Sequence, residues 1–322
     1  MSESIDAVVT WVDGDDPVHR EKRERFGEAR APATSTGGAR FGEMGELFYC
    51  LRSILLFAPF IRRIHVVTDA QTPPALARLR AERPLDAERL VLVDHRDIFR
   101  GFEHRLPTFN SRTIETMLFR VPELAERFIS FNDDMFLARP LSLGAVFEDA
   151  PVLHGRWRLM RPGMQRMGRK RTASMRAGYG KGQANAARLL GYRWRYAEVG
   201  HVPQPMRRSV FERFFRANPR VLDAQIAHRF RSAEQFVPAS LARHLELQGG
   251  TALRPPLAEA FLRPDHADET IDRVLDGLSQ GRYAVGCVQE LNRFPLPARA
   301  RIEAALDALT RNADALSESQ FA

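Results

Sequence analysis

Four short apolar segments, separated by stretches of helical periodicity, limit what this chain can fold into. They lie at residues 5–12, 64–68, 90–94 and 128–132. The intervening stretches predict helices at residues 18–30, around 44–55, 74–82 and 111–120. Strands that alternate with helices in this way are typical of a layered α/β/α domain with a largely parallel sheet.

A carboxylate follows or closes each of the four expected strands. These residues are Asp13, Asp69, Asp94 and the pair Asp133-Asp134. One terminal Asp would simply favour a turn. Ligands of parallel sheets bind beyond the carboxyl ends of the strands, so acids at four such ends indicate a site for a divalent cation and a phosphorylated ligand.

The pair Asp133-Asp134 is enclosed by apolar residues in the segment SFNDDMFL, residues 130–137. Carboxylates within an apolar layer are costly unless a metal ion or a cationic side chain compensates them. Mg²⁺ and Mn²⁺ prefer oxygen ligands, and one or two carboxylates leave room for substrate phosphates. From the pair alone, an ordinary polar turn remains an equal alternative.

The net charge of +8 is concentrated in one segment. Between Asp149 and Glu198 the chain has twelve Arg or Lys residues and no acidic residue. Such a segment attracts nucleotide diphosphates, anionic polymers, nucleic acid or lipid surfaces, or it is a solvated loop. We therefore divide the chain into an α/β core at 1–150, a basic Gly-rich loop at 151–198 and a mainly helical part at 199–322. Within the last part the pattern predicts helices at 209–217, 222–230, 238–247, 267–278 and 298–309.

No apolar run reaches the length of roughly 20 residues that spans a bilayer, and the first residues lack the pattern of a signal peptide. The two cysteines, Cys50 and Cys287, make no disulfide framework and lack metal-site spacing. These features predict a cytoplasmic protein.

Three other candidates are uninformative when each is taken alone. Glu115 borders the apolar face of a predicted helix, where a solvated Glu is common. His201 lies on an expected loop, and Arg231 lies at an expected helix end that favours cations. The sequence has no Walker or Rossmann phosphate loop, no serine nucleophile elbow, no zinc signature and no kinase motif set.

Long blocks of the chain resemble the Stealth family of sugar-1-phosphate transferases. These blocks are IDAVVTWVDGDDP (5–17), the segments 40–73 and 106–140, and HVPQPMRRSVFERFF with HRFRS (201–215 and 228–232). The family includes bacterial capsule and exopolysaccharide phosphotransferases and the catalytic subunit of animal N-acetylglucosamine-1-phosphotransferase. A fourth block, at 285–303, keeps the Cys and the Phe-Pro-x-Pro pattern, but it has Gln289-Glu290 where the family pattern gives Asn-Asp.

The resemblance implies a GT-A/Rossmann-like sheet and assigns roles to particular positions. It implies Mg²⁺ or Mn²⁺ held by Asp133 and Asp134. The implied catalytic residues are Glu115, Asp134, His201 and Arg231. The implied nucleotide-sugar site comprises Trp11, Val12, Asp13, Gly14, Arg52, Asp69, Asn110, Ser111 and Asn132.

The implied reaction moves hexose-1-phosphate from a UDP-sugar, with N-acetylglucosamine as the expected sugar, to an acceptor sugar hydroxyl and releases UMP. Either Glu115 or His201 is the general base, and the sequence leaves both open. The expected partners are the UDP-sugar and a glycan acceptor, with no nucleic acid and with peripheral contact at the inner membrane face. The alternatives are a GT-A glycosyltransferase that releases UDP and a non-catalytic protein that binds polyanions or membrane surfaces.

Overall fold

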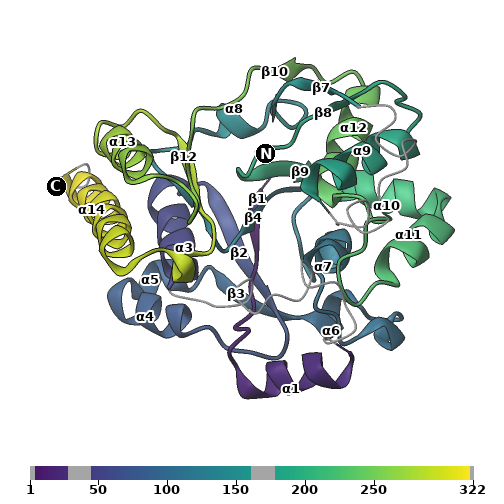
Figure 1. Cartoon of the computed structure of the whole chain (residues 1–322), viewed down its shortest axis with the longest axis horizontal. Coiled ribbons are helices and arrows are strands. Elements are labelled where there is room, and N and C mark those ends of the chain that lie inside the picture. Colours follow the sequence, from purple (N-terminus) through teal and green to yellow (C-terminus); the bar gives the residue numbers. More distant parts are fainter. Residues whose placement is uncertain (1–3, 28–44, 161–177, 320–322) are drawn as a thin grey trace.

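The structure is a computed structural model that describes residues 4–27, 45–160 and 178–319. The expected loop at 31–39, the end of the expected helix at 18–30 and the middle of the basic segment lie outside these residues. Figure 1 labels most of the helices and strands that follow.

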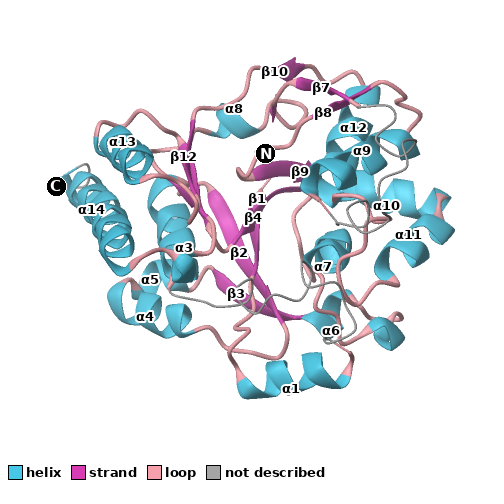
Figure 2. Ribbon diagram, viewed as in Figure 1, coloured by secondary structure: helices cyan, strands magenta, loops and turns pink. Residues whose placement is uncertain are grey.

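A five-stranded sheet forms the centre of the molecule (Figures 1 and 2). In spatial order its strands are β3 (Leu90–Asp94), β2 (Ile61–Thr68), β1 (Ile5–Thr10), β4 (Arg127–Asn132) and β9 (Gln204–Arg207). The first four are parallel, as the sequence predicts, and β9 runs antiparallel to β4. The sequence analysis missed β9 because this short strand contains Pro205, which lacks an N–H and is tolerated only at a sheet edge.

Helices cover both faces of this sheet (Figure 1). Along β1, Ala7 and Val9 face one apolar core and Val8 faces the other. The first core is closed by α3 (Glu46–Phe57), α4 (Pro74–Glu82), α13 (Asp268–Ser279) and α14 (Leu296–Ser319). The second is closed by α6 (His95–Ile98), α7 (Ser111–Met117), α10 (Arg208–Ala217), α11 (Pro219–Ile226) and α12 (Pro238–Gln248). The predicted layered α/β/α fold is confirmed.

A three-stranded sheet brings the C-terminal part of the chain against the acidic pair. It consists of β11 (Glu259–Leu262), β12 (Val285–Val288) and β5 (Met135–Leu137), the strand directly after Asp134. At Gly286 a Cβ would lie 2.2 Å from Cζ of Phe136, so only glycine permits this approach of β12 to β5. The segments 1–150, 151–198 and 199–322 therefore interleave in space.

The basic segment is more regular than the sequence suggests. Its described part contains β7 (Trp157–Leu159), which pairs with β8 (Arg195–Ala197), and the helix α9 (Tyr179–Leu189). The prediction of a loop was wrong here, because small residues of α9 pack with Met160 in an apolar cluster of their own. The predicted helix at 222–230 was also too long, since α11 ends at Ile226 and the following residues attach to α7 instead. The remaining elements are α1 (Pro17–Arg25), α5 (Pro84–Ala87), η3 (Glu103–Arg105), η4 (Leu118–Arg120), α8 (Leu143–Val146), β6 (Leu153–His154), β10 (Leu253–Arg254) and η5 (Leu291–Arg293).

Candidate functional site

The strand ends that carry the acids meet at one edge of the central sheet. Thr10, the last residue of β1, pairs with Asn132, the last residue of β4. Thr68 of β2 pairs with Asp94 of β3. The loop after β1 and the turn after β4 therefore emerge side by side, which is where parallel sheets bind their ligands.

Asp69 and Asp94 make internal contacts at this edge. Oδ2 of Asp69 lies 3.1 Å from Nδ1 of His19 and 3.1 Å from Nζ of Lys22, both on α1. Asp94 caps α6, and its Oδ2 accepts a hydrogen bond of 2.7 Å from the backbone N–H of Ala70. These two acids stabilise the edge itself.

Asp134 differs from them because one of its carboxylate oxygens, Oδ1, is buried and has no hydrogen-bond partner among the described residues. Burial raises the pKa of Asp134 to about 6; the neighbouring Glu46 acts in the same direction, whereas the Cys287 thiol and the Arg231 guanidinium oppose the shift. The turn is fixed by its backbone, since the carbonyl of Asp134 accepts a hydrogen bond of 2.9 Å from the N–H of Val288 on β12. A rigid turn thus presents an unsatisfied acceptor.

Arg231 is placed by a loop that α7 holds at several points. The side chain of Asn110 caps α7 and donates to the carbonyl of His228 at 3.0 Å and to Oε1 of Gln235 at 2.8 Å. Arg112 donates to the carbonyl of Ser232 at 3.2 Å. Asn110, predicted as a nucleotide-sugar ligand, is fully buried and so acts in this structure as the anchor of the Arg231 loop.

The three other residues predicted to be catalytic lie around the Arg231 guanidinium, which donates a hydrogen bond of 2.6 Å from Nη2 to Oγ of Ser111. Its positive charge acts to lower the pKa values of all three residues, Glu115, Asp134 and His201, although burial outweighs this effect at the two acids. All three therefore lie within its electrostatic reach. They come from α7, from the turn after β4 and from the loop before β9. Glu115 and Asp134 share the block 106–140, whereas His201 and Arg231 lie more than sixty residues further along the chain.

Burial raises the pKa of Glu115, against the opposing charges of Arg231 and Arg112 and a hydrogen bond with Ser111. Ser111 therefore contacts both Glu115 and Arg231. The shift brings this carboxyl closer to neutral pH, which suits a general base or acid.

His201 stacks between two aromatic rings. The centroid of its ring lies 4.8 Å from that of Tyr179 and 5.3 Å from that of Phe261. Burial lowers its pKa, and Arg231 and Arg263 lower it further. His201 is therefore a neutral imidazole at pH 7.

The residues after β1 form an ordered loop beside this cluster. The amide of Gln71 makes two hydrogen bonds of 2.9 Å with the backbone of Asp13, and Arg23 donates to the carbonyl of Gly14 at 3.0 Å. Trp11 is buried, and its indole Nε1 has no hydrogen-bond partner in the part of the chain that the structure describes. Val12 is half-buried.

Two other predicted nucleotide-sugar ligands lie as follows. Asn132 ends β4, and its carbonyl accepts a contact of 3.6 Å from Sγ of Cys50. Arg52 of α3 lies against α4, where Nη1 donates to Oε2 of Glu82 at 3.2 Å, and it lies over the ring of Phe48.

The sequence analysis missed five residues of the site because they act through contacts between distant segments. Arg112 could have been found because it directly follows Ser111, a predicted site residue. Gln289 stands where the family pattern gives Asn, and this departure was the one feature of the sequence that drew attention to it. No sequence pattern marks Tyr179 or Phe261. Cys287 is marked only by its place in the fourth block, at 285–303.

Among the described residues, no group of three His, Cys, Asp or Glu side chains is arranged to hold a metal ion. Mg²⁺ does not need such a group, because it is often bound by one or two carboxylates together with substrate phosphates and water. The unsatisfied Oδ1 of Asp134, with Asp133 beside it in the turn, fits that mode of binding.

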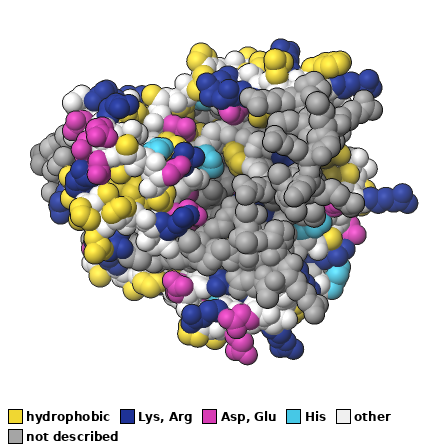
Figure 3. Space-filling view, in the orientation of Figure 1, with side chains coloured by type: hydrophobic (Ala, Val, Ile, Leu, Met, Phe, Trp, Pro, Cys, Tyr) yellow, Lys and Arg dark blue, Asp and Glu magenta, His cyan; other side chains and the backbone are white. Residues whose placement is uncertain are grey.

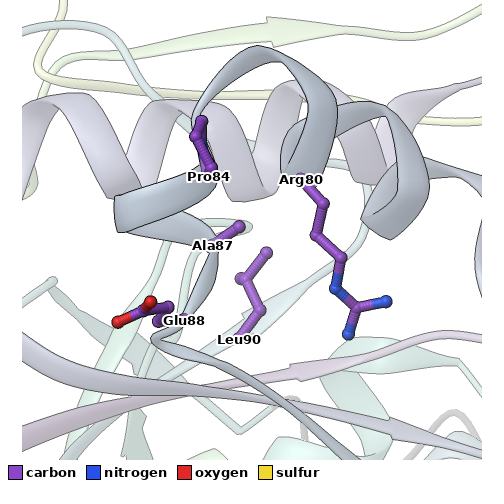
Figure 4. A pocket seen from close by; sticks show the side chains of 5 residues that line it. All are labelled: Arg80, Pro84, Ala87, Glu88 and Leu90. Atoms are coloured by element: carbon purple, nitrogen blue, oxygen red, sulfur yellow. The ribbon is translucent and has the colours of Figure 1, made fainter.

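Other surface features do not compete with this site. A small pocket at α5 is lined by Arg80, Pro84, Ala87, Glu88 and Leu90 (Figure 4), and these side chains bring no set of catalytic groups together. On the face shown in Figure 3, the described Lys and Arg side chains are interspersed with Asp and Glu. No described helix is long and apolar enough to cross a membrane.

Comparisons with known proteins match this chain to two conserved regions of one family. Residues 3–31 match Stealth protein CR1, conserved region 1, and residues 40–153 match Stealth protein CR2, conserved region 2. An exopolysaccharide phosphotransferase of Streptomyces coelicolor is 33% identical over 93% of this chain and 53% of its own. The exopolysaccharide phosphotransferase CpsY of Mycobacterium tuberculosis is 31% identical over 95% of this chain and 56% of its own.

A capsular polysaccharide phosphotransferase of Actinobacillus pleuropneumoniae, cps1A, is 39% identical over 45% of this chain and 38% of its own. Among solved structures, apo mouse xyloside xylosyltransferase 1 aligns with 88% of this chain and 97% of its own. The sequence identity is 9% and the TM-score is 0.39. The chain spans about half the length of the curated relatives that it matches most fully.

The fold is that of a layered α/β/α domain with an acidic turn at the carboxyl edge of its parallel strands. The matches to both conserved regions place it further: the chain belongs to the Stealth family.

Proposed function

We propose that this protein transfers hexose-1-phosphate from a UDP-sugar to a hydroxyl of a glycan acceptor and releases UMP. The observation that carries the proposal is the position of Arg231, whose charge reaches Glu115, Asp134 and His201. Phosphoryl transfer depends mainly on positioning and charge neutralisation, and a cation among acid–base groups supplies both. The named relatives, which are capsular and exopolysaccharide phosphotransferases, support the same reaction.

In this reaction the acceptor oxygen forms a bond to the β-phosphorus, and the bond from that phosphorus to the bridging oxygen breaks. The bridging oxygen leaves with UMP, and the product is a phosphodiester between acceptor and hexose. Arg231 would neutralise charge on the transferring phosphoryl group, and Ser111 would orient both Arg231 and Glu115. The acceptor proton would pass to a basic group at this centre.

Asp134, with Asp133, would hold Mg²⁺ or Mn²⁺. When bound, such an ion supplies charge neutralisation for the diphosphate of the donor. The loop Trp11–Gly14, which emerges next to the acidic turn, would bind the nucleotide. N-acetylglucosamine as the transferred sugar and contact of the basic segment with a membrane face remain predictions.

The main competing function is glycosyl transfer, in which the same donor reacts at the anomeric carbon and UDP is released. A UDP-sugar labelled at the β-phosphorus separates the two reactions. Phosphotransfer moves the label into the acceptor and releases unlabelled UMP, whereas glycosyl transfer leaves the label in UDP. Label found only in UDP would exclude the proposed reaction.

Two Arg variants test whether Arg231 carries the activity. Arg231→Ala should lower kcat by roughly 10²-fold or more, because it removes a charge from the reacting centre. Arg220→Ala is the matched control, since Arg220 is an exposed residue of α11. Full activity of the Arg231 variant would refute the proposed site.

A further inference from the structure

Stacking on two aromatic rings fixes the plane of the His201 ring. It does not determine which edge of the ring carries Nδ1. The Tyr179 and Phe261 rings lie on its two faces at interplanar angles of 25° and 11°. A rotation of the imidazole by 180° about its Cβ–Cγ bond would exchange Nδ1 with Cδ2 and Nε2 with Cε1. The ring would stay in the same plane, so the stacking would be almost unchanged. A polar contact at the ring edge must therefore choose between the two orientations.

Gln289 supplies that contact. Its side-chain Nε2 lies 3.3 Å from Nδ1 of His201. Gln289 is itself held in place, since its backbone N–H donates to the carbonyl of Leu262 at 3.0 Å, next to Phe261. With the amide oriented as in this structure, its NH₂ group faces the ring and can only donate, so Nδ1 accepts and a neutral ring carries its proton on Nε2.

We propose that Gln289 is a positioning residue that holds His201 as the neutral Nε2–H tautomer, which makes His201 a hydrogen-bond donor and leaves Glu115 as the general base. This inference rests on the proposed function and resolves the choice between Glu115 and His201. A ring with its proton on Nε2 and its Nδ1 occupied by Gln289 has no free lone pair with which to accept a proton from the acceptor.

The charges around both groups agree with these roles. The groups that face His201 are Tyr179, Gln289, Arg231 and Arg263, and the two cations disfavour an imidazolium there. Burial raises the pKa of Glu115, which increases the basicity of its carboxylate. The two shifts act in opposite directions, as expected for one neutral donor and one base.

The proton balance of the transfer is then complete. The hydroxyl proton of the acceptor passes to the Glu115 carboxylate as the acceptor oxygen bonds to phosphorus. The electron pair of the broken bond leaves on the bridging oxygen of UMP. His201 donates its Nε2–H to an oxygen of the transferring group and keeps its proton throughout.

The first test needs no substrate. Nitrogen NMR of the full chain, labelled at its nine histidines, distinguishes the two tautomers by the chemical shifts of the ring nitrogens. The His201 signal is assigned as the one that the His201→Gln variant lacks. We expect the Nε2–H form in the unmodified protein, and the Nδ1–H form would overturn the proposal even if the transferase activity is as proposed.

The second test removes the positioning contact. Gln289→Leu should mix the tautomers in the NMR spectrum and lower kcat by roughly 10- to 100-fold, the effect of removing a partner that orients a functional imidazole. Gln280→Leu, at an exposed position after α13, is the control and should change neither. An unchanged His201 signal in Gln289→Leu would contradict the role of Gln289.

The third test separates donor from base. Glu115→Gln should abolish the acidic limb of the pH profile of kcat, whereas His201→Gln, which keeps an N–H donor, should retain that limb and more activity than His201→Ala. The reverse pattern, with the limb lost in His201→Gln and kept in Glu115→Gln, would make His201 the base. If no variant of the protein shows transfer at all, the proposed function fails while the tautomer result still stands.

Discussion

Two aspartates at opposite ends of the central sheet have opposite surroundings. Asp6, near the start of β1, is fully buried and completely hydrogen-bonded. Its carboxylate accepts hydrogen bonds from Arg62 at 2.9 and 2.7 Å and from the N–H of Ala125 at 2.8 Å, and Nε2 of His65 lies 3.1 Å away. Asp134, beyond the end of β4, leaves Oδ1 without a partner among the described residues.

The difference is visible in the protonation of the two groups. Burial alone would raise the pKa of Asp6, but the hydrogen bonds from His65, Arg62 and Ala125 outweigh it and hold that pKa well below its usual range. At Asp134 the effect of burial is larger than the opposing effects of Cys287 and Arg231, so the pKa of Asp134 is raised. The fold thus satisfies one buried acid for stability and leaves the other available to a ligand, since an unsatisfied buried carboxylate persists only where something compensates it.

The largest effect is expected from removing divalent cations. Chelation should abolish transfer completely, and added Mg²⁺ or Mn²⁺ should restore it, because Oδ1 of Asp134 has no hydrogen-bond partner among the described residues, whereas the Asp6 carboxylate is hydrogen-bonded to Arg62. Product formation with and without chelator measures this. Calorimetric titration of Mg²⁺ in the presence of donor should show binding that Asp134→Asn loses and that an Asp6 variant keeps; full transfer in the chelator would exclude the metal.

Asp134→Asn should lower kcat by roughly 10²- to 10³-fold, as expected for a group that neutralises charge at the reacting centre. Its melting temperature should not fall, because Oδ1 of Asp134 makes no hydrogen bond to a described residue that the substitution could remove. Asp149→Asn, at an exposed position, is the matched control. A strong loss of stability without a loss of activity would make Asp134 structural, like Asp6.

Asp6→Ala should lower the free energy of unfolding by about 3 kcal/mol, because it leaves buried donors unpaired. The activity per folded molecule should remain unchanged. Chemical denaturation measures the first quantity and active-site titration the second. Asp272→Ala, which breaks only an exposed ion pair with Arg301, should cost less than about 1 kcal/mol. Equal losses in the two variants would contradict the role of Asp6.

Gly286→Ala should destabilise the protein by about 1–3 kcal/mol through overpacking against Phe136, which is buried and cannot move aside. The strain lies one residue from Cys287, the thiol that contacts Asp134, so activity should fall as well. Gly144→Ala, where nothing lies within 4 Å of the added Cβ, is the control. Thermal melts of both variants decide the matter, and a neutral Gly286→Ala would show that β12 can shift.

The smallest effect is the pH dependence of the Asp6 contribution. A carboxyl whose folded-state pKa is depressed stabilises the protein fully above its ordinary pKa of 3.8, and that stability is lost as the pH falls towards the folded-state value. The difference in unfolding free energy between the unmodified protein and Asp6→Asn should therefore be constant at neutral pH and shrink below about pH 4. Denaturation curves at several pH values measure it, and a difference independent of pH would exclude the linkage.

Much of the fold could be predicted because it depends on local pattern. The apolar runs of β1 to β4 and the helical periodicity of α4 and α12 have short-range causes. Among the elements that were missed, β9, β11 and β12 are strands of four residues whose pairing partners lie far away in the chain. Strand pairing at long range leaves little signal in so short a segment.

The site divides in the same way. The acidic pair at Asp133 and Asp134 is marked by its sequence, because charged residues inside an apolar run are rarely accidental. Asn110 and Asp69 were predicted as ligands, and in this structure both make hydrogen bonds with protein groups. The same residue types serve capping, ion pairing and ligand binding, so only the neighbours in space distinguish these uses.

By itself, the sequence determined a parallel α/β sheet and the acidic turn at the carboxyl edge of that sheet, because hydrophobic periodicity and strand-end chemistry are local properties. Only the tertiary structure decided that Arg231 joins Glu115, Asp134 and His201, and that Gln289 and two aromatic rings hold the imidazole. Those contacts join segments far apart in the chain, and their energies arise only when the packed core has excluded water and fixed the distances.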